Sequence, residues 1–168
     1  MIERFVFAVE GEVVLEHTIY GNPIPFKRVR ANTRGKRPVF YNDHTYTKYK
    51  KFVGSEIVKI LGLKNMPVIP EVGSKERTKH LADTRYFLRA KFYRDARRGD
   101  KDNLEKVFND SFQDIGLIAN DEQIDDSYIS KAIDKDNPRV EFCLIKLPVP
   151  VKTKKPKKKK GKSNELEN

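Results

Sequence analysis

Hydrophobic residues recur along this chain with two different spacings, which predict a mixture of strands and helices. In residues 86–93 they favour alternate positions, the period of a strand with one buried face. In residues 45–61 and 103–115 they recur three and four positions apart, as in a helix with one buried side. The second predicted helix stops at Gly116, a residue typical of helix C-termini.

Residue type predicts further strands and the segments between them. Residues 4–20 are rich in β-branched and aromatic side chains and are broken by Glu10-Gly11, so we expect two strands joined by a tight turn. Residues 124–133 and 140–147 are predicted as strands, residues 21–40 as an irregular basic loop, and residues 62–84 as a connector. Strands and helices interleave without the rhythm of a parallel doubly wound sheet. The sequence therefore predicts a small α/β domain of the α+β type, with a mixed sheet and two main helices.

The composition adds a separate tail to this domain. The chain has 168 residues and a formal net charge of +11, and residues 148–168 hold 8 Lys against 2 Glu. Such a segment has too little to bury to offset its ordering entropy, so we expect a domain over residues 1–147 and a disordered Lys-rich tail over 148–168. The tail could strengthen binding to nucleic acid or act only as a solubility segment.

Several classes of protein are excluded by the same composition. No run approaches the roughly 18 apolar residues of a membrane helix, and acidic residues stand where a signal peptide would be basic. The single Cys143 excludes an internal disulfide and a multi-cysteine zinc site. We therefore expect a cytoplasmic protein with no membrane partner.

Candidate chemistry is concentrated in the segment from Asp95 to Lys131. Asp100 and Asp102 lie two positions apart where the second predicted helix begins, and Asp102, Lys106 and Asp110 fall on one helical face. After Gly116 the chain returns with Asp121, which we expect beside the first two carboxylates. Carboxylates with a substrate phosphate suit Mg²⁺, and a nearby lysine can stabilise developing negative charge. Taken singly, Asp102 could instead be a helix cap with Glu105, and Lys106 with Asp110 an ordinary surface ion pair.

These residues form a string that resembles a known family. Asp100-x-Asp102-Asn103-Leu104-x-Lys106, an aspartate at 110, and Asp121-x-Gln123-Ile124 resemble the motifs of the RusA family of Holliday junction resolvases. The Pro-rich segment from Gly21 to Arg28 is similar to that family's basic N-terminal loop. The resemblance covers roughly residues 17–147.

The resemblance implies both an activity and its residues. It implies a homodimeric, Mg²⁺-dependent endonuclease, with Mn²⁺ as a substitute ion and no small-molecule cofactor, that makes paired nicks in four-way DNA junctions. The chain would then be bacterial or phage-encoded. By position, Asp100, Asp102 and Asp121 would be the metal-binding and catalytic aspartates and Lys106 the catalytic lysine. Asn120 stands where the family usually has an acid, so Asn120 and Asp110 are candidates only for supporting roles.

Basic residues outside this string predict the DNA-contacting surface. Close like charges repel unless a polyanion relieves them, so clustered Arg and Lys side chains favour a phosphate-binding role. Tyrosines near the first cluster could stack on unpaired bases or pack within the predicted first helix. Two alternatives remain open: a nuclease for flaps, forks or other branched DNA, and a non-catalytic DNA-binding protein. The predicted DNA-binding residues are Lys27, Arg28, Arg30, Arg34, Lys36, Arg37, Arg97 and Arg98.

Overall fold

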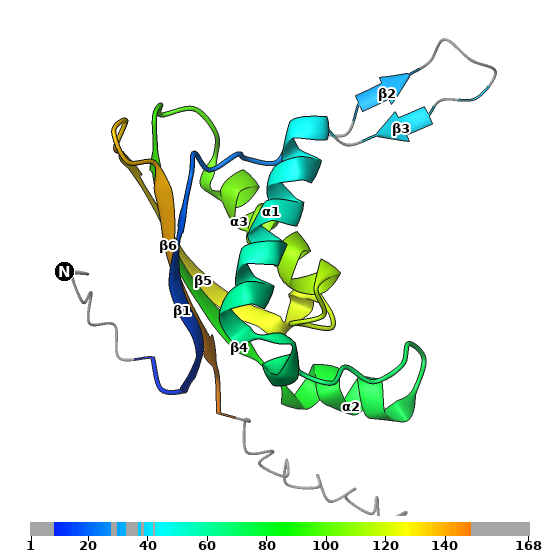
Figure 1. The fold of residues 1–168 in the computed structure, drawn as a ribbon. Coiled ribbons are helices and arrows are strands. Elements are labelled where there is room, and N and C mark those ends of the chain that lie inside the picture. Colours follow the sequence, from blue (N-terminus) through cyan, green and yellow to red (C-terminus); the bar gives the residue numbers. More distant parts are fainter. Residues whose placement is uncertain (1–8, 28–29, 33–36, 38, 42, 149–168) are drawn as a thin grey trace, which may run out of the picture.

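The computed structural model describes residues 9–27, 30–32, 37, 39–41 and 43–148, and it confirms the α+β fold with a mixed sheet. Four strands form the sheet in the order β1-β6-β4-β5, and helices lie against one side of it (Figure 1). β1 and β6 run antiparallel, as do β6 and β4, whereas β4 and β5 run parallel. The strands are β1 (Glu12–Tyr20), β4 (Tyr86–Arg94), β5 (Ile124–Ile133) and β6 (Arg139–Lys146).

The core forms between the sheet and two helices, α1 (His44–Leu61) and α3 (Lys101–Asp114). Alternate residues of β4 are buried from Tyr86 to Arg94, which confirms the strand predicted from the two-residue period. On α3 the buried residues include Leu104, Phe108 and Phe112, at the expected helical spacing. Phe108 packs edge-on against Phe92 of β4, with ring centroids 5.7 Å apart.

The start of α1 differs by two residues from the prediction. The predicted range 45–61 made Thr45 the candidate cap, but Asp43 occupies the cap position and its carboxylate accepts hydrogen bonds from the backbone N–H groups of Thr45 and Tyr46. An aspartate is as good a cap as a threonine. The helix therefore begins at His44, directly after its cap.

Two segments predicted as irregular contain regular structure. Residues 62–84, predicted as a connector, contain the short 3-10 helix η1 (Leu63–Asn65) and the helix α2 (Lys75–Asp83). The predicted basic loop contains a hairpin of β2 (Arg30–Asn32) and β3 (Val39–Tyr41). The first of the two strands predicted in residues 4–20 falls mostly outside the described residues. None of the described helices combines the length and apolar character needed to cross a membrane.

The parallel pair β4 and β5 decides where the motif residues lie. Tyr86 at the start of β4 pairs with Ile124 at the start of β5, and Arg94 pairs with Ile133 at the other end. The helix α3 carries the chain back between these two strands, so it begins beside the end of β4 and finishes beside the start of β5 (Figure 1). Segments that precede and follow α3 therefore lie at opposite ends of the sheet.

Candidate active site

Two of the predicted aspartates lie at the start of α3, and neither carboxylate has a hydrogen-bond or ion-pair partner among the described residues. Asp100 is the residue that caps the helix by position, with φ −77° and ψ 155°, but its side chain makes no capping hydrogen bond. Asp102 lies in the first turn, so the prediction that it caps the helix together with Glu105 is wrong. Both aspartates are exposed. The start of α3 thus presents two exposed carboxylates two positions apart in the sequence.

Lys106 lies one turn further along α3 and is held by an ion pair. Its Nζ lies 3.3 Å from Oδ1 of Asp110, and its side chain is 44% exposed. The other oxygen of Asp110 accepts a short hydrogen bond from the hydroxyl of Tyr46 on α1. Burial, together with the Asp110 carboxylate, raises the pKa of Tyr46 well above its usual range, so the hydroxyl remains a donor. Asp110 therefore connects a lysine at the surface to a tyrosine in the core.

The Pro-rich loop before β2 packs beside this lysine. The backbone N–H of Phe26 donates to the carbonyl of Asn103 at 2.7 Å, which ties the loop to the first turn of α3. The ring of Phe26 lies 5.1 Å from that of Tyr46, edge-on, and 5.4 Å from Nζ of Lys106. Lys106 is thus placed by a carboxylate on one side and an aromatic ring on another.

Asp121 lies beyond the far end of α3, in the short 3-10 helix η2 (Asp121–Gln123). Gln123 is fully buried and holds this turn, because its Oε1 accepts from the N–H of Ala119 at 2.6 Å and its Nε2 donates to the carbonyl of Thr84 at 3.0 Å. Asn120 caps η2, and its Oδ1 accepts from the N–H of Glu122 and from Gln113. Asp121 itself is exposed.

Within one chain, the structure does not bring Asp121 to Asp100 and Asp102. Gln113, which bonds Asn120, lies eleven residues after Asp102 on the same helix, a separation of about 16 Å along the axis at 1.5 Å per residue. Consistently, the described residues contain no group of three or more His, Cys, Asp or Glu side chains that could hold a metal ion. The three aspartates therefore form two separate groups on this chain.

The pair at the start of α3 nevertheless fits a hydrated divalent cation. Mg²⁺ is usually held by one or two carboxylates together with waters and substrate phosphates, and it needs no closed protein cage. The Asp100 carboxylate supports this fit, because it makes no capping hydrogen bond. An aspartate at a cap position normally accepts a hydrogen bond from a backbone N–H group of the helix. Asp100 and Asp102 are accordingly the residues of this chain that would hold such an ion.

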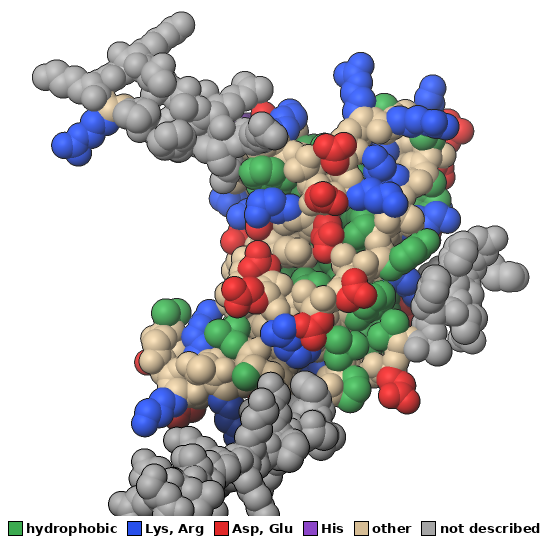
Figure 2. Space-filling view, turned by 180° about the vertical axis from the view of Figure 1, so that it is seen from behind, with side chains coloured by type: hydrophobic (Ala, Val, Ile, Leu, Met, Phe, Trp, Pro, Cys, Tyr) green, Lys and Arg blue, Asp and Glu red, His purple; other side chains and the backbone are tan. Residues whose placement is uncertain are grey.

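The predicted DNA-binding residues fall partly outside the described part of the chain. Arg28, Arg34 and Lys36 lie outside it, and for Arg30 only the backbone is described, in β2. Among the rest, Lys27 pairs with Asp43 at 3.4 Å, while Arg37, Arg97 and Arg98 are exposed. Figure 2 shows the face turned away from the viewer in Figure 1, where acidic side chains run down the middle and Lys and Arg gather above them.

Burial decides between the two roles left open for the tyrosines. Tyr46 and Tyr49 are 1% and 7% exposed, so they pack in the core and cannot stack on DNA bases. Arg94, which ends β4 just before the loop to Asp100, is also buried, at 8% exposed. Its Nε donates to the carbonyl of Pro23 at 2.9 Å. Sequence reasoning missed both Tyr46 as the partner of Asp110 and Gln123 as the anchor of the Asp121 turn.

The motif region also coincides with a match to a known family. A family model described as endodeoxyribonuclease RusA matches residues 20–145, from the end of β1 nearly to the end of β6. The match therefore contains α3, η2 and all of the candidate residues that lie on them. A search of curated proteins finds no match to the chain.

Proposed function

The chain belongs to the RusA family of endodeoxyribonucleases, and from this premise we propose that it resolves Holliday junctions by paired, Mg²⁺-dependent nicks in opposing strands. The family supplies the general activity, hydrolysis of DNA phosphodiester bonds at a junction. The observation that supports the site lies at the start of α3. Two exposed aspartates, one of which makes no capping hydrogen bond, lie about one helical turn before a lysine that is held by an ion pair.

Each of these side chains has a role in the proposed reaction. Asp100 and Asp102 bind the divalent cation through their carboxylate oxygens. When bound, that ion would polarise the scissile phosphate and lower the pKa of a nearby water. Lys106 holds its ammonium group toward the phosphate oxygens, where it stabilises the negative charge that develops as the bond breaks. Asp110 keeps Lys106 in this place and is itself fixed by Tyr46.

Asp121 enters this proposal through a second copy of the chain. Within one chain it lies past the other end of α3, so a carboxylate from this turn reaches Asp100 and Asp102 only from a partner. A two-fold dimer offers the same contact twice, which gives two centres related by symmetry. A four-way junction has matching symmetry, and this supports paired rather than single nicks.

The test is a comparison of binding and incision in Asp102→Asn. We expect this variant to bind a labelled four-way junction as the wild type does, because the phosphate contacts elsewhere are unchanged. Incision in Mg²⁺ should fall by more than about 100-fold, since even outer-shell partners of a bound metal commonly contribute about 10- to 100-fold. The same loss is expected for the wild type in EDTA.

The matched control is Asp136→Asn, which removes one exposed carboxylate from the β5–β6 turn. It should cut at the wild-type rate. If Asp102→Asn also cuts at the wild-type rate, Asp102 has no catalytic role. A panel containing flaps and forks beside the junction identifies the branched substrate that is cut fastest, and a preference for either of these over the junction would contradict the proposed substrate.

A further inference from the structure

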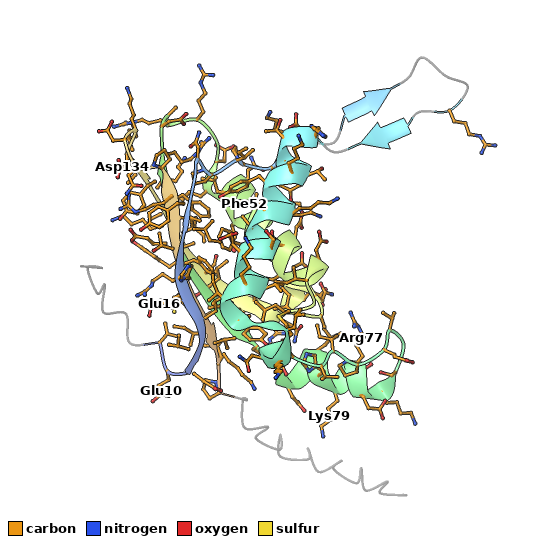
Figure 3. All side chains as sticks on the ribbon, in the orientation of Figure 1. Glu10, Glu16, Phe52, Arg77, Lys79 and Asp134 are labelled. Atoms are coloured by element: carbon orange, nitrogen blue, oxygen red, sulfur yellow. The ribbon has the colours of Figure 1, made fainter. Side chains whose placement is uncertain are left out.

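A pocket of about 360 Å³ lies at the end of β4 and β5 from which the chain enters the loop to Asp100. Asp134, labelled in Figure 3, follows directly on β5 at this end, and its N–H donates to the carbonyl of Arg94 at 2.9 Å. The pocket is lined by Arg94, Ala96, Arg97, Lys131, Ala132 and Ile133.

All the charged residues that line this pocket are cations. Asp95 and Asp134 are close by in sequence but are not among the lining residues. The Asp134 carboxylate is already bound by Nη1 of Arg139 at 2.7 Å, and this hydrogen bond lowers its pKa. The pocket therefore carries three positive charges without a carboxylate in its wall.

Arg94 is the most unusual of the three cations. It is 8% exposed, its Nε donates to a backbone carbonyl, and its buried Nη1 has no partner among the described residues. Burial lowers the pKa of Arg94, although the charge of Asp95 opposes this. A buried cation without a bound carboxylate is costly, and an anion nearby would offset that cost.

Arg97 and Lys131 supply the donors that a ligand can reach, since both are exposed. Nζ of Lys131 donates to the carbonyl of Gly99 at 2.5 Å, so it is held against the loop and retains further N–H groups. Arg97 forms no hydrogen bond within the described chain and can present its planar donors to a phosphate. Gly99 leaves room for Arg94, because a Cβ there would lie 3.2 Å from Nη1.

We propose that this pocket binds a backbone phosphate of the DNA, next to the strand that is cut. The inference rests on the proposed function, which places the scissile phosphate at Asp100, one residue beyond the loop that forms the pocket. Arg97 and Lys131 contact the phosphate, and Arg94 contributes its charge from the wall. The pocket thereby fixes the position of the strand relative to the aspartates.

The experiment measures junction binding against salt concentration in the Asp102→Asn background, so incision does not enter. Each phosphate contact contributes about 0.9 to the slope of log affinity against log salt. We expect the double variant Arg97→Gln/Lys131→Gln to lower that slope by about one. The double variant Lys75→Gln/Lys79→Gln removes equal charge from α2, where Lys79 is visible in Figure 3, and should leave the slope unchanged.

A second variant separates occupancy of the pocket from long-range charge. Ala96→Leu adds bulk to the lining without altering any charge and should lower the slope as the double variant does. An unchanged slope in either pocket variant, or an equal fall in the α2 control, would overturn the proposal. A different outcome is that inorganic phosphate raises the melting temperature of the wild type but not that of Arg97→Gln/Lys131→Gln. If that double variant also leaves the salt slope of DNA binding unchanged, the pocket is assigned to free phosphate.

The two proposals can fail separately. If the pocket variants lower the slope but the wild-type protein cuts no junction, the phosphate pocket is retained and the nuclease activity is refuted. If the pocket variants leave the slope unchanged but the wild-type protein cuts junctions, the pocket is refuted and the nuclease activity is retained.

Discussion

Two tyrosines one turn apart on α1 bury their hydroxyl groups in different surroundings. The Tyr46 hydroxyl donates to the carboxylate of Asp110, while the Tyr49 hydroxyl is buried without a hydrogen-bond partner in the described structure. A bond to a charged group is worth more than a neutral one, and an unpartnered buried hydroxyl costs free energy. The two residues should therefore respond in opposite ways to loss of the hydroxyl.

Replacement of each tyrosine by phenylalanine tests this difference, because the ring and its packing are kept. We expect Tyr46→Phe to lower the free energy of unfolding by about 1.5–3 kcal/mol, the usual range for a hydrogen bond to a charged group. Tyr49→Phe should leave the free energy of unfolding unchanged or raise it. Urea denaturation measures both, and equal losses in the two variants would contradict the assigned bond. Tyr46→Phe should also slow incision more than it weakens junction binding, because Asp110 holds Lys106 less firmly.

At this scale the sequence identifies candidate residues but does not predict how they are arranged. The type and spacing of Asp100, Asp102 and Lys106 are enough to mark the start of α3 as the candidate site. Which aspartate occupies the cap position was not predictable, because either choice satisfies the helical pattern. Arg94 is a different case. The alternation that buries Phe92 in β4 buries Arg94 one step later, so extending that pattern by one period would have found it.

Among the elements, α2 is the longest that the hydrophobic pattern did not predict. None of its residues is buried, so it has no apolar stripe to detect. It is held by polar contacts instead. Ser74 caps it by accepting from the N–H of Arg77, and the Arg77 side chain, labelled in Figure 3, donates to the carbonyls of Pro70 and Ala119. Contacts between such distant segments are not encoded in a local period.

The η2 turn gives an element whose integrity depends on one buried side chain. Replacing Gln123 by methionine keeps the approximate shape but leaves the Ala119 N–H and the Thr84 carbonyl without their partner. Each hydrogen bond contributes about 0.5–1.5 kcal/mol, so we expect the loss of these two to lower the free energy of unfolding by about 1–3 kcal/mol. Hydrogen exchange at the Ala119 amide should be faster in Gln123→Met than in the wild type.

The control for this variant is Gln113→Met on α3. The Gln113 side chain is half-buried and makes one long hydrogen bond, 3.4 Å, to Asn120. We therefore expect Gln113→Met to lower the free energy of unfolding by less than about 1 kcal/mol. Slow exchange at Ala119 in Gln123→Met would mean that the turn is held by other contacts.

In the whole molecule, the order of strands separates residues that the sequence places close together. Asp102 and Asp121 are fewer than twenty positions apart, yet the parallel pairing of β4 with β5 puts a full helix between them. The residue pattern predicts the four strands of the main sheet but not which strands are neighbours. The expected three-carboxylate group therefore could not be judged from the sequence. The disorder and DNA-binding role of residues 148–168 stay predictions, because these residues lie almost wholly outside the described part of the chain.

A mixing experiment tests whether the two groups meet between chains. Asp102→Asn and Asp121→Asn, each alone, should be inactive, since every centre then carries one lesion. After the two proteins are mixed and allowed to exchange subunits, a mixed dimer has one centre with both lesions and one centre intact. We therefore expect recovered nicking of single strands, read on a denaturing gel, without paired cuts.

The two outcomes of mixing are distinct. If all three aspartates acted within one chain, the mixed dimer would have one lesion in each centre and would stay inactive. Recovered activity requires that Asp121 of one copy serves the aspartates of the other.

The return path of α3 has a consequence for the protein in dilute solution. Under the proposed arrangement, each chain carries its carboxylates at opposite ends of one helix and contributes half of each of two centres. At protein concentrations where the dimer is mostly dissociated, the rate of cutting should then rise with the square of the protein concentration. Very dilute protein should therefore cut almost no DNA.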